Sequence, residues 1–138
     1  MQRLFYCIAA LILFALPSVA ASQADMGLCW FNYDVNGRPT AVFDIFRDSR
    51  GRIWLGTTSG LSQFDGYQSY PATYGESSFR AQIYSMVERD GAIYVGTNDG
   101  LFLLDPEQGS VVPVDGDFPR EIRTMLLLGD NLWIGSLS

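Results

Sequence analysis

The stretch that decides the fold is IWLGTTSGLSQFD at residues 53–65, because it recurs as IYVGTNDGLFLLD at residues 93–105. Six of the thirteen aligned positions are identical, where unrelated segments would share about one. A third copy begins at residue 132 with LWIGSLS. The second position of each copy holds a large aromatic residue, and these are spaced 40 and 39 residues apart: Trp54, Tyr94 and Trp133. The chain is therefore predicted to repeat one supersecondary unit.

A shorter segment repeats upstream of each aromatic stretch. Residues 42–46, 83–87 and 122–126 align, with apolar residues at the first and fourth positions and a small polar residue at the third. In the second copy the pair Asp90-Gly91 joins this segment to the aromatic stretch. This pair favours a type I′ hairpin turn, so the two segments are predicted to be neighbouring antiparallel strands.

Each unit has room for two further strands. In the first unit they are predicted at 61–64 and around 67–70, and in the second at 101–104 and 110–114. Four short antiparallel strands in forty residues are typical of a β-propeller blade, and no window shows a helical period. We therefore expect an all-β fold, a partial β-propeller of about two and a half blades in an open arc.

These patterns divide the chain into five parts. The expected parts are a signal peptide at 1–21, an N-terminal segment at 22–41 with a strand that could complete another blade, blade 1 at 42–81, blade 2 at 82–121, and the first half of blade 3 at 122–138.

The repeated residues have a structural interpretation, because every blade has the same packing problem. The glycine two positions after each aromatic residue is expected to let the next sheet come close, while the aromatic side chain fills the space between blades. The residues assigned to this packing and to the turns are Trp54, Gly56, Gly60, Tyr94, Gly96, Gly100, Trp133 and Gly135. An open arc should leave two bare faces with Trp54 and Trp133 partly without partners, so we expect the chain to associate or aggregate.

The N-terminus is typical of an export signal. Arg3 precedes an apolar run at 4–16, then Pro17 and the small residues at 18–21 follow. An uncleaved membrane anchor is the alternative, but the run is shorter than the roughly 20 residues that a membrane span needs. We expect the mature chain in the periplasm, with Cys29 as its one cysteine and no intrachain disulfide.

Composition excludes several kinds of chemistry. The chain has no His and no Lys, so catalysis by a His-containing triad, His metal ligands and Schiff-base chemistry are excluded. The net charge of −6 disfavours binding to nucleic acid. We expect no catalytic residues, no metal and no cofactor.

The string from Asp48 to Asp65, with Gly51, Trp54 and Gly56 at fixed spacing, resembles the two-component regulator propeller repeat. The resemblance implies a seven-bladed propeller in the periplasmic half of a bacterial hybrid sensor. In such sensors a membrane helix, a histidine kinase and a response regulator follow the propeller, and polysaccharide breakdown products are often the ligands. It also implies that a strand such as 29–33 completes the last blade. We expect the chain to be a fragment of such a sensor, with the remaining blades or another copy of the chain as partner.

Loops at one end of the blades are the candidate ligand site. In a propeller the connections between blades share a face with the loops that join the second and third strands. Arg, Asn and Asp side chains there suit a sugar or a uronic acid, although they could equally be ordinary polar turn residues. The candidate ligand-binding residues are Arg38, Thr58, Arg80, Gln82, Asn98, Asp99 and Arg120.

Three functions remain open. The first is a non-catalytic sensory or ligand-binding propeller, and the second is a secreted scaffold or adhesin. The third is a sialidase-like or lyase-like propeller enzyme. It is disfavoured because the spacing from Asp48 to Trp54 is one residue longer than in the sialidase aspartate box. Glycoside hydrolysis would also need two dedicated carboxylates in a pocket.

Overall fold

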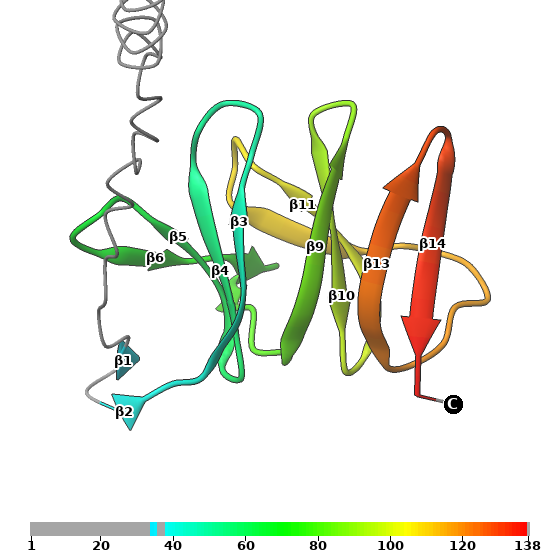
Figure 1. Cartoon of the computed structure of the whole chain (residues 1–138). Coiled ribbons are helices and arrows are strands. Elements are labelled where there is room, and N and C mark those ends of the chain that lie inside the picture. The colour runs from blue at the N-terminus through cyan, green and yellow to red at the C-terminus, as the bar shows by residue number, and fades with distance from the viewer. Residues whose placement is uncertain (1–33, 36–37, 138) are drawn as a thin grey trace, which may run out of the picture. The chain divides into compact units, whose positions relative to one another are not determined.

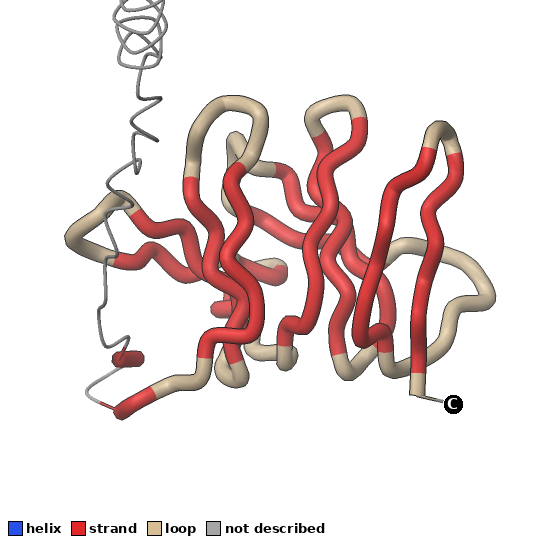
Figure 2. Tube along the Cα trace, in the orientation of Figure 1, coloured by secondary structure: helices blue, strands red, loops and turns tan. Residues whose placement is uncertain are grey.

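Every regular element that the structure describes is a β-strand (Figure 2). The structure is a computed structural model that describes residues 34–35 and 38–137. The predicted signal peptide and the predicted strand at 29–33 lie outside the described residues. Within the described part, successive residues of a strand point to opposite faces of its sheet, and both faces of the middle sheet pack against neighbouring sheets.

The first repeat forms a four-stranded antiparallel sheet, which we call blade 1. Its strands, in sheet order, are β3 (Val42–Arg47), β4 (Ile53–Thr57), β5 (Gly60–Phe64) and β6 (Ser69–Pro71). A small separate hairpin precedes it, made of β1 (Asp34–Val35) and β2 (Arg38–Pro39).

The second repeat forms blade 2, and its sheet is wider than predicted. Four antiparallel strands match the expected pattern: β9 (Ile83–Arg89), β10 (Ala92–Thr97), β11 (Gly100–Asp105) and β12 (Ser110–Pro113). The connection from blade 1 adds β7 (Thr73–Tyr74) and β8 (Ser77–Ser78) at the outer edge. Thr73 pairs with Ser110 in parallel, so this connection covers an edge that would otherwise expose backbone hydrogen-bonding groups.

The third repeat contributes one hairpin, which we call blade 3. It consists of β13 (Ile122–Leu128) and β14 (Asn131–Ser136). The inner strands β3, β9 and β13 lie side by side (Figure 1), with contacts from β3 to β9 and from β9 to β13. The predicted fold class is therefore confirmed: the described residues form an all-β, partial β-propeller that is an open arc.

Two turns show how local sequence sets the strand ends. Asp90 and Gly91 both have positive φ, 53° and 80°, as a type I′ hairpin requires. The fourth strand of blade 1 was predicted around 67–70, but β6 occupies Ser69–Pro71. The reason is that the Oδ1 atom of Asp65 accepts hydrogen bonds from the backbone N–H groups of Tyr67 and Gln68, which keeps both residues in the turn.

Each inner strand is joined to the next one by a side-chain hydrogen bond. The backbone N–H of Met86 donates to Oδ2 of Asp44 at 2.7 Å, and that of Met125 donates to Oγ of Ser85 at 3.1 Å. Asp44 and Ser85 are the small polar residues at the third position of the repeated inner segment. Burial raises the pKa of Asp44 above its ordinary value, although the hydrogen bonds from the N–H groups of Met86 and Ile45 oppose this.

The repeated glycines lie where neighbouring blades come closest. A Cβ on Gly56 would lie 2.7 Å from Cγ2 of Ile83, and a Cβ on Gly96 would lie 2.6 Å from Cγ2 of Ile122. Both isoleucines occupy the first position of an inner strand. The first apolar residue of each inner strand therefore packs on the glycine of the preceding blade.

The two repeated tryptophans differ in burial. Trp54 is fully buried within a cluster that includes Ile83 and Met86 of blade 2, whereas Trp133 is 61% exposed. The expectation that Trp54 would lack partners was wrong, because its face of blade 1 is the one that blade 2 covers. Trp133 lies on the corresponding face of blade 3, against which no further described sheet packs.

The close approach at Gly96 leads to a stability prediction. Gly96→Val should lower the free energy of unfolding by roughly 1–3 kcal/mol, because the new side chain overlaps Ile122. Chemical denaturation followed by circular dichroism measures this loss. In the double variant Gly96→Val with Ile122→Ala, the loss should be smaller than the sum of the two single losses. An unchanged denaturation curve for Gly96→Val, or strict additivity, would contradict the packing.

Candidate functional site

The loops at one end of the blades are tied together by backbone contacts. The N–H of Asn98 donates to the carbonyl of Gln82 at 3.1 Å, and the N–H of Gln82 donates to Oδ1 of Asn98 at 2.8 Å. These contacts join the β10–β11 turn to the connection between blades 1 and 2. At the matching place in blade 1, the N–H of Thr58 donates to the carbonyl of Ala41 at 3.1 Å. These hydrogen bonds therefore hold the loops in place without a ligand.

An open groove of about 630 Å³ lies beside these loops. It is formed by the start of β9, the β10–β11 turn, the connection into β13 and the end of the described chain. Most of its lining side chains are polar or charged. The lining residues are Gln82, Tyr84, Asn98, Pro119, Arg120, Glu121, Arg123 and Leu137.

Two arginines in the groove each form an ion pair with a carboxylate. Nε of Arg120 lies 3.2 Å from Oδ1 of Asp99, and both side chains are mostly exposed. Arg123 forms an ion pair with Glu121, and its guanidinium carbon lies 4.1 Å from the centre of the Tyr84 ring. Because a guanidinium has five N–H donors, both arginines keep donors that can reach a ligand.

Aromatic rings continue the groove along the inner strands. The hydroxyl of Tyr84 donates to Oε1 of Gln82 at 2.7 Å, which fixes the direction of the ring. The ring centres of Tyr84 and Phe43 are 5.5 Å apart, and Phe43 is half exposed. The two rings, tilted by 36° to each other, thus form an apolar surface that adjoins the charged groups, an arrangement that suits a ring-shaped polar ligand.

The structure brings together four of the seven residues predicted to bind a ligand. Gln82, Asn98 and Arg120 line the groove, and Asp99 contacts Arg120 at its rim. Thr58 and Arg80 are not among the described lining residues, and the side chain of Arg38 lies outside the described part of the structure. Arg38 lies in β2, Thr58 makes the loop contact with Ala41, and Arg80 is exposed in the connection before β9.

Five lining residues did not appear among the predicted binding residues: Tyr84, Pro119, Glu121, Arg123 and Leu137. A signal for two of them was present, since Tyr84 and Arg123 occupy the second position of the repeated inner segment, as Phe43 does. The second position lies between the first and the fourth positions, whose side chains pack against the preceding blade. Its side chain is therefore available to a ligand rather than to the core.

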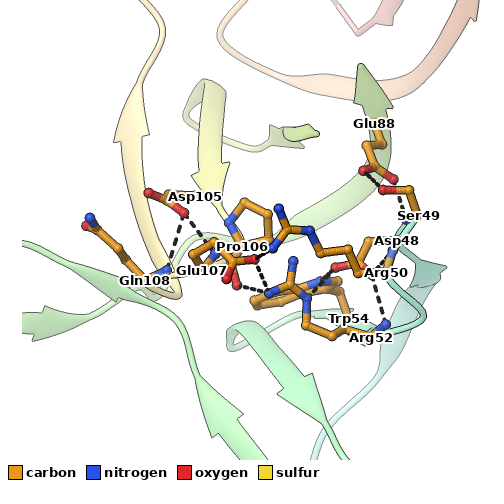
Figure 3. Close-up of polar contacts among 10 residues, drawn as sticks. All are labelled: Asp48, Ser49, Arg50, Arg52, Trp54, Glu88, Asp105, Pro106, Glu107 and Gln108. Atoms are coloured by element: carbon orange, nitrogen blue, oxygen red, sulfur yellow. Dashed lines mark hydrogen bonds and ion pairs between the residues drawn. The ribbon is translucent and has the colours of Figure 1, made fainter. Parts of the chain in front are cut away.

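A second polar cluster lies at the opposite turns and joins blades 1 and 2 (Figure 3). The carboxylate of Asp48 is buried, and its Oδ2 atom accepts hydrogen bonds from Nε of Arg52 at 2.7 Å and from Nε1 of Trp54 at 3.2 Å. Arg52 also donates to the carbonyl of Pro106 at 2.6 Å and to Oε1 of Glu107 at 2.8 Å. The cluster thus connects the β3–β4 turn with the β11–β12 turn.

This second cluster has a structural role. Burial alone would raise the pKa of Asp48, but the hydrogen bonds from Arg52 and Trp54 outweigh it and hold the pKa below its ordinary value. The carboxylate is therefore held ionised by its partners. Because Arg52, the partner of Asp48, also bonds to Pro106 and Glu107, the cluster stabilises the contact between blades 1 and 2.

Within the described residues, no group of three or more His, Cys, Asp or Glu side chains is placed to hold a metal ion. In the same part of the chain, no helix has the length and hydrophobicity of a membrane span.

Comparisons with known proteins agree with this architecture. The family model for the two component regulator propeller matches residues 36–59, which include β3, β4 and the turn that holds Asp48. The chain thus carries a two component regulator propeller repeat at residues 36–59. No curated protein sequence matches the chain significantly.

Solved structures with similar folds come from B. thetaiotaomicron. The extracellular domain of BT4673 is 35% identical over 78% of this chain, with a TM-score of 0.66. BT4673 is described as a one component system in one structure and as a hybrid two component system in another. The extracellular domain of BT3049, described as a hybrid two component system, is 19% identical over 76% of the chain, with a TM-score of 0.51, which supports the fold alone. The chain spans only 14–17% of these domains, so the propeller repeats here correspond to a small part of each.

Proposed function

We propose that the chain is part of an extracytoplasmic, periplasmic sensory propeller that binds an acidic oligosaccharide without chemically changing it. The similarity to extracellular domains of two component systems supports the sensory role. The observation that supports the ligand class is the groove, which Arg120 lines and in which the guanidinium of Arg123 lies over the ring of Tyr84. The guanidinium groups would bind carboxylates of the sugar through paired hydrogen bonds, and the half-exposed ring of Phe43, next to Tyr84, would pack against a sugar face.

The composition of the groove also supports a non-catalytic role. Among the described residues that line it, Glu121 is the one carboxylate, and it is paired with Arg123. Hydrolysis of a glycosidic bond generally uses two carboxyl groups on opposite sides of the bond. The groove therefore favours binding over hydrolysis, and the chain would contribute recognition to a signalling protein.

Binding can be tested by nuclear magnetic resonance on the full chain, with oligogalacturonate as the acidic probe. Arg120→Ala should weaken binding by about tenfold or more, because a charge-assisted hydrogen bond is lost. Arg80→Ala is the matched control, since Arg80 is an exposed arginine of a neighbouring loop that does not line the groove. Its affinity should stay close to that of the unchanged chain.

Two results would contradict the proposal. One is the absence of chemical-shift changes in the groove at millimolar oligogalacturonate. The other is an equal loss of affinity for Arg80→Ala and Arg120→Ala, which would indicate attraction to the general surface charge. Release of shorter sugars during the titration would show catalysis and would overturn the non-catalytic part.

A further inference from the structure

In blades 2 and 3, the residue just before the inner strand contacts the residue at the second position of that strand. Side chains two residues apart in a strand lie on the same face. In blade 2 the hydroxyl of Tyr84 donates to Oε1 of Gln82, and in blade 3 Arg123 forms an ion pair with Glu121. Ile122, which lies between the two charged residues, is fully buried against blade 2. Glu121 and Arg123 therefore both lie on the side of the strand that faces the groove.

The contacts of Arg123 limit how its guanidinium can bind a ligand. The guanidinium carbon lies 4.1 Å from the centre of the Tyr84 ring, so the ring covers one flat side of the group. A carboxylate binds a guanidinium best in its plane, where two parallel N–H groups meet the two oxygens. Each edge that offers such a pair includes an N–H of Nη2, and Nη2 is the atom that contacts Oε1 of Glu121. Glu121 therefore holds the atom that a ligand carboxylate needs.

The contact between Glu121 and Arg123 is weak enough to be exchanged. The side chain of Glu121 is 31% exposed and that of Arg123 is 42% exposed. An ion pair this open to water changes an equilibrium by at most about fivefold. The second contact of the carboxylate is long, because Oε1 of Glu121 lies 3.5 Å from the hydroxyl oxygen of Tyr84, which donates its proton to Gln82. A ligand carboxylate that forms paired hydrogen bonds can therefore displace Glu121.

We propose that Glu121 is an internal competitor, which holds Arg123 in place of the ligand carboxylate until an acidic ligand displaces it. This inference rests on the proposed function, because it concerns the same groove and the same class of ligand. On displacement one carboxylate replaces another, so the guanidinium is paired both before and after binding. An anion without further contacts in the groove gains little from this exchange, whereas an acidic sugar also gains its contacts with Arg120 and Phe43.

Binding of an acidic and a neutral probe to the full chain tests the competition, with oligogalacturonate as the acidic probe and its methyl ester as the neutral one. Glu121→Gln keeps the size of the side chain and removes its charge. It should bind oligogalacturonate about fivefold more tightly than the unchanged chain, or tighter still. The methyl ester should gain less, because it has no carboxylate to take the place of Glu121.

Two further variants separate the ion pair from the general charge of the surface. Asp117→Asn removes the same charge from the same connection, at an exposed position outside the described groove lining. Its affinity for oligogalacturonate should change by less than about twofold at physiological salt. Arg123→Ala should weaken binding, and adding Glu121→Gln to it should bring no more gain than Asp117→Asn does, since the pair is already absent.

The outcomes that contradict the inference differ from those that contradict the proposed function. If the unchanged chain binds oligogalacturonate and Glu121→Gln binds it equally or more weakly, Glu121 does not compete, although the groove is still the ligand site. An equal gain for Asp117→Asn, for the methyl ester or in the Arg123→Ala background would likewise exclude competition at Arg123. If neither the unchanged chain nor Glu121→Gln binds oligogalacturonate, the ligand class is wrong and the inference fails with it.

Discussion

Replacing Trp54 by alanine is expected to lower the free energy of unfolding by about 3–5 kcal/mol, the largest single effect in the chain. The side chain is fully buried between blades 1 and 2, and its removal leaves a cavity among Ile83, Met86 and their neighbours. The indole N–H is also the partner of Asp48, so the substitution removes a buried hydrogen bond. Chemical denaturation followed by circular dichroism measures the loss without relying on tryptophan fluorescence.

Trp133→Ala is the matched control, because Trp133 occupies the same position of the repeat but is mostly exposed. Its loss should be well below that of Trp54→Ala. If Trp54→Ala does not fold, Trp54→Phe keeps a ring in the space and should show a smaller, measurable loss. Equal losses for Trp54→Ala and Trp133→Ala would contradict the placement of Trp54 between blades.

Replacing Asp48 by alanine should lower the free energy of unfolding by about 2–4 kcal/mol. The substitution leaves the buried indole N–H of Trp54 without its acceptor and removes the ion pair with Arg52, whose side chain is mostly buried. Asp99→Ala is the control, because Asp99 forms an exposed ion pair with Arg120 and should contribute less than about 1 kcal/mol. A loss for Asp48→Ala no greater than that for Asp99→Ala would contradict a structural role for the cluster.

The ionisation of Asp48 also makes the free energy of unfolding depend on pH, in a direction that its pKa determines. Because the pKa of Asp48 is lower in the folded chain than its ordinary value of 3.8, the stabilisation is complete above that value. It is lost as the pH falls through the folded-state pKa. The stability difference between the unchanged chain and Asp48→Asn should therefore shrink in acid, and Asp44 does not disturb this comparison since it is present in both. A difference that stays constant or grows on acidification would show that the charge of Asp48 is not what stabilises the cluster.

The sequence predicted those features of the fold that depend on residues close together in the chain. Alternating apolar residues and the pair Asp90-Gly91 predicted strands and a type I′ turn, and the structure has both. The spacing of Gly56 and Gly96 indicated a close approach, and the nearest atoms belong to the next inner strand. These features were readable because each depends on residues close together in the chain.

What the sequence did not reveal depends on contacts between blades. The strands β7 and β8 form because the connection between blades 1 and 2 pairs with the edge strand β12, where Thr73 lies opposite Ser110. No residue pattern within 72–82 predicts that pairing. Asp48 begins the string that resembles the family repeat, but the string does not reveal that its carboxylate bonds to Trp54 or that Arg52 extends the contact to Glu107 in another blade. Likewise, Arg123 enters the groove only because β13 lies beside β9.

The central claim is that each blade packs its glycine against the first residue of the next inner strand. Nuclear Overhauser effects between the Hα protons of Gly56 and Gly96 and the methyl groups of Ile83 and Ile122 test it most directly, since they require no substitution. The structure predicts strong effects for the pairs Gly56–Ile83 and Gly96–Ile122. If neither pair gives a nuclear Overhauser effect in spectra that do show the cross-strand effects between β9 and β10, the sheets do not stack as blades and the central claim is wrong.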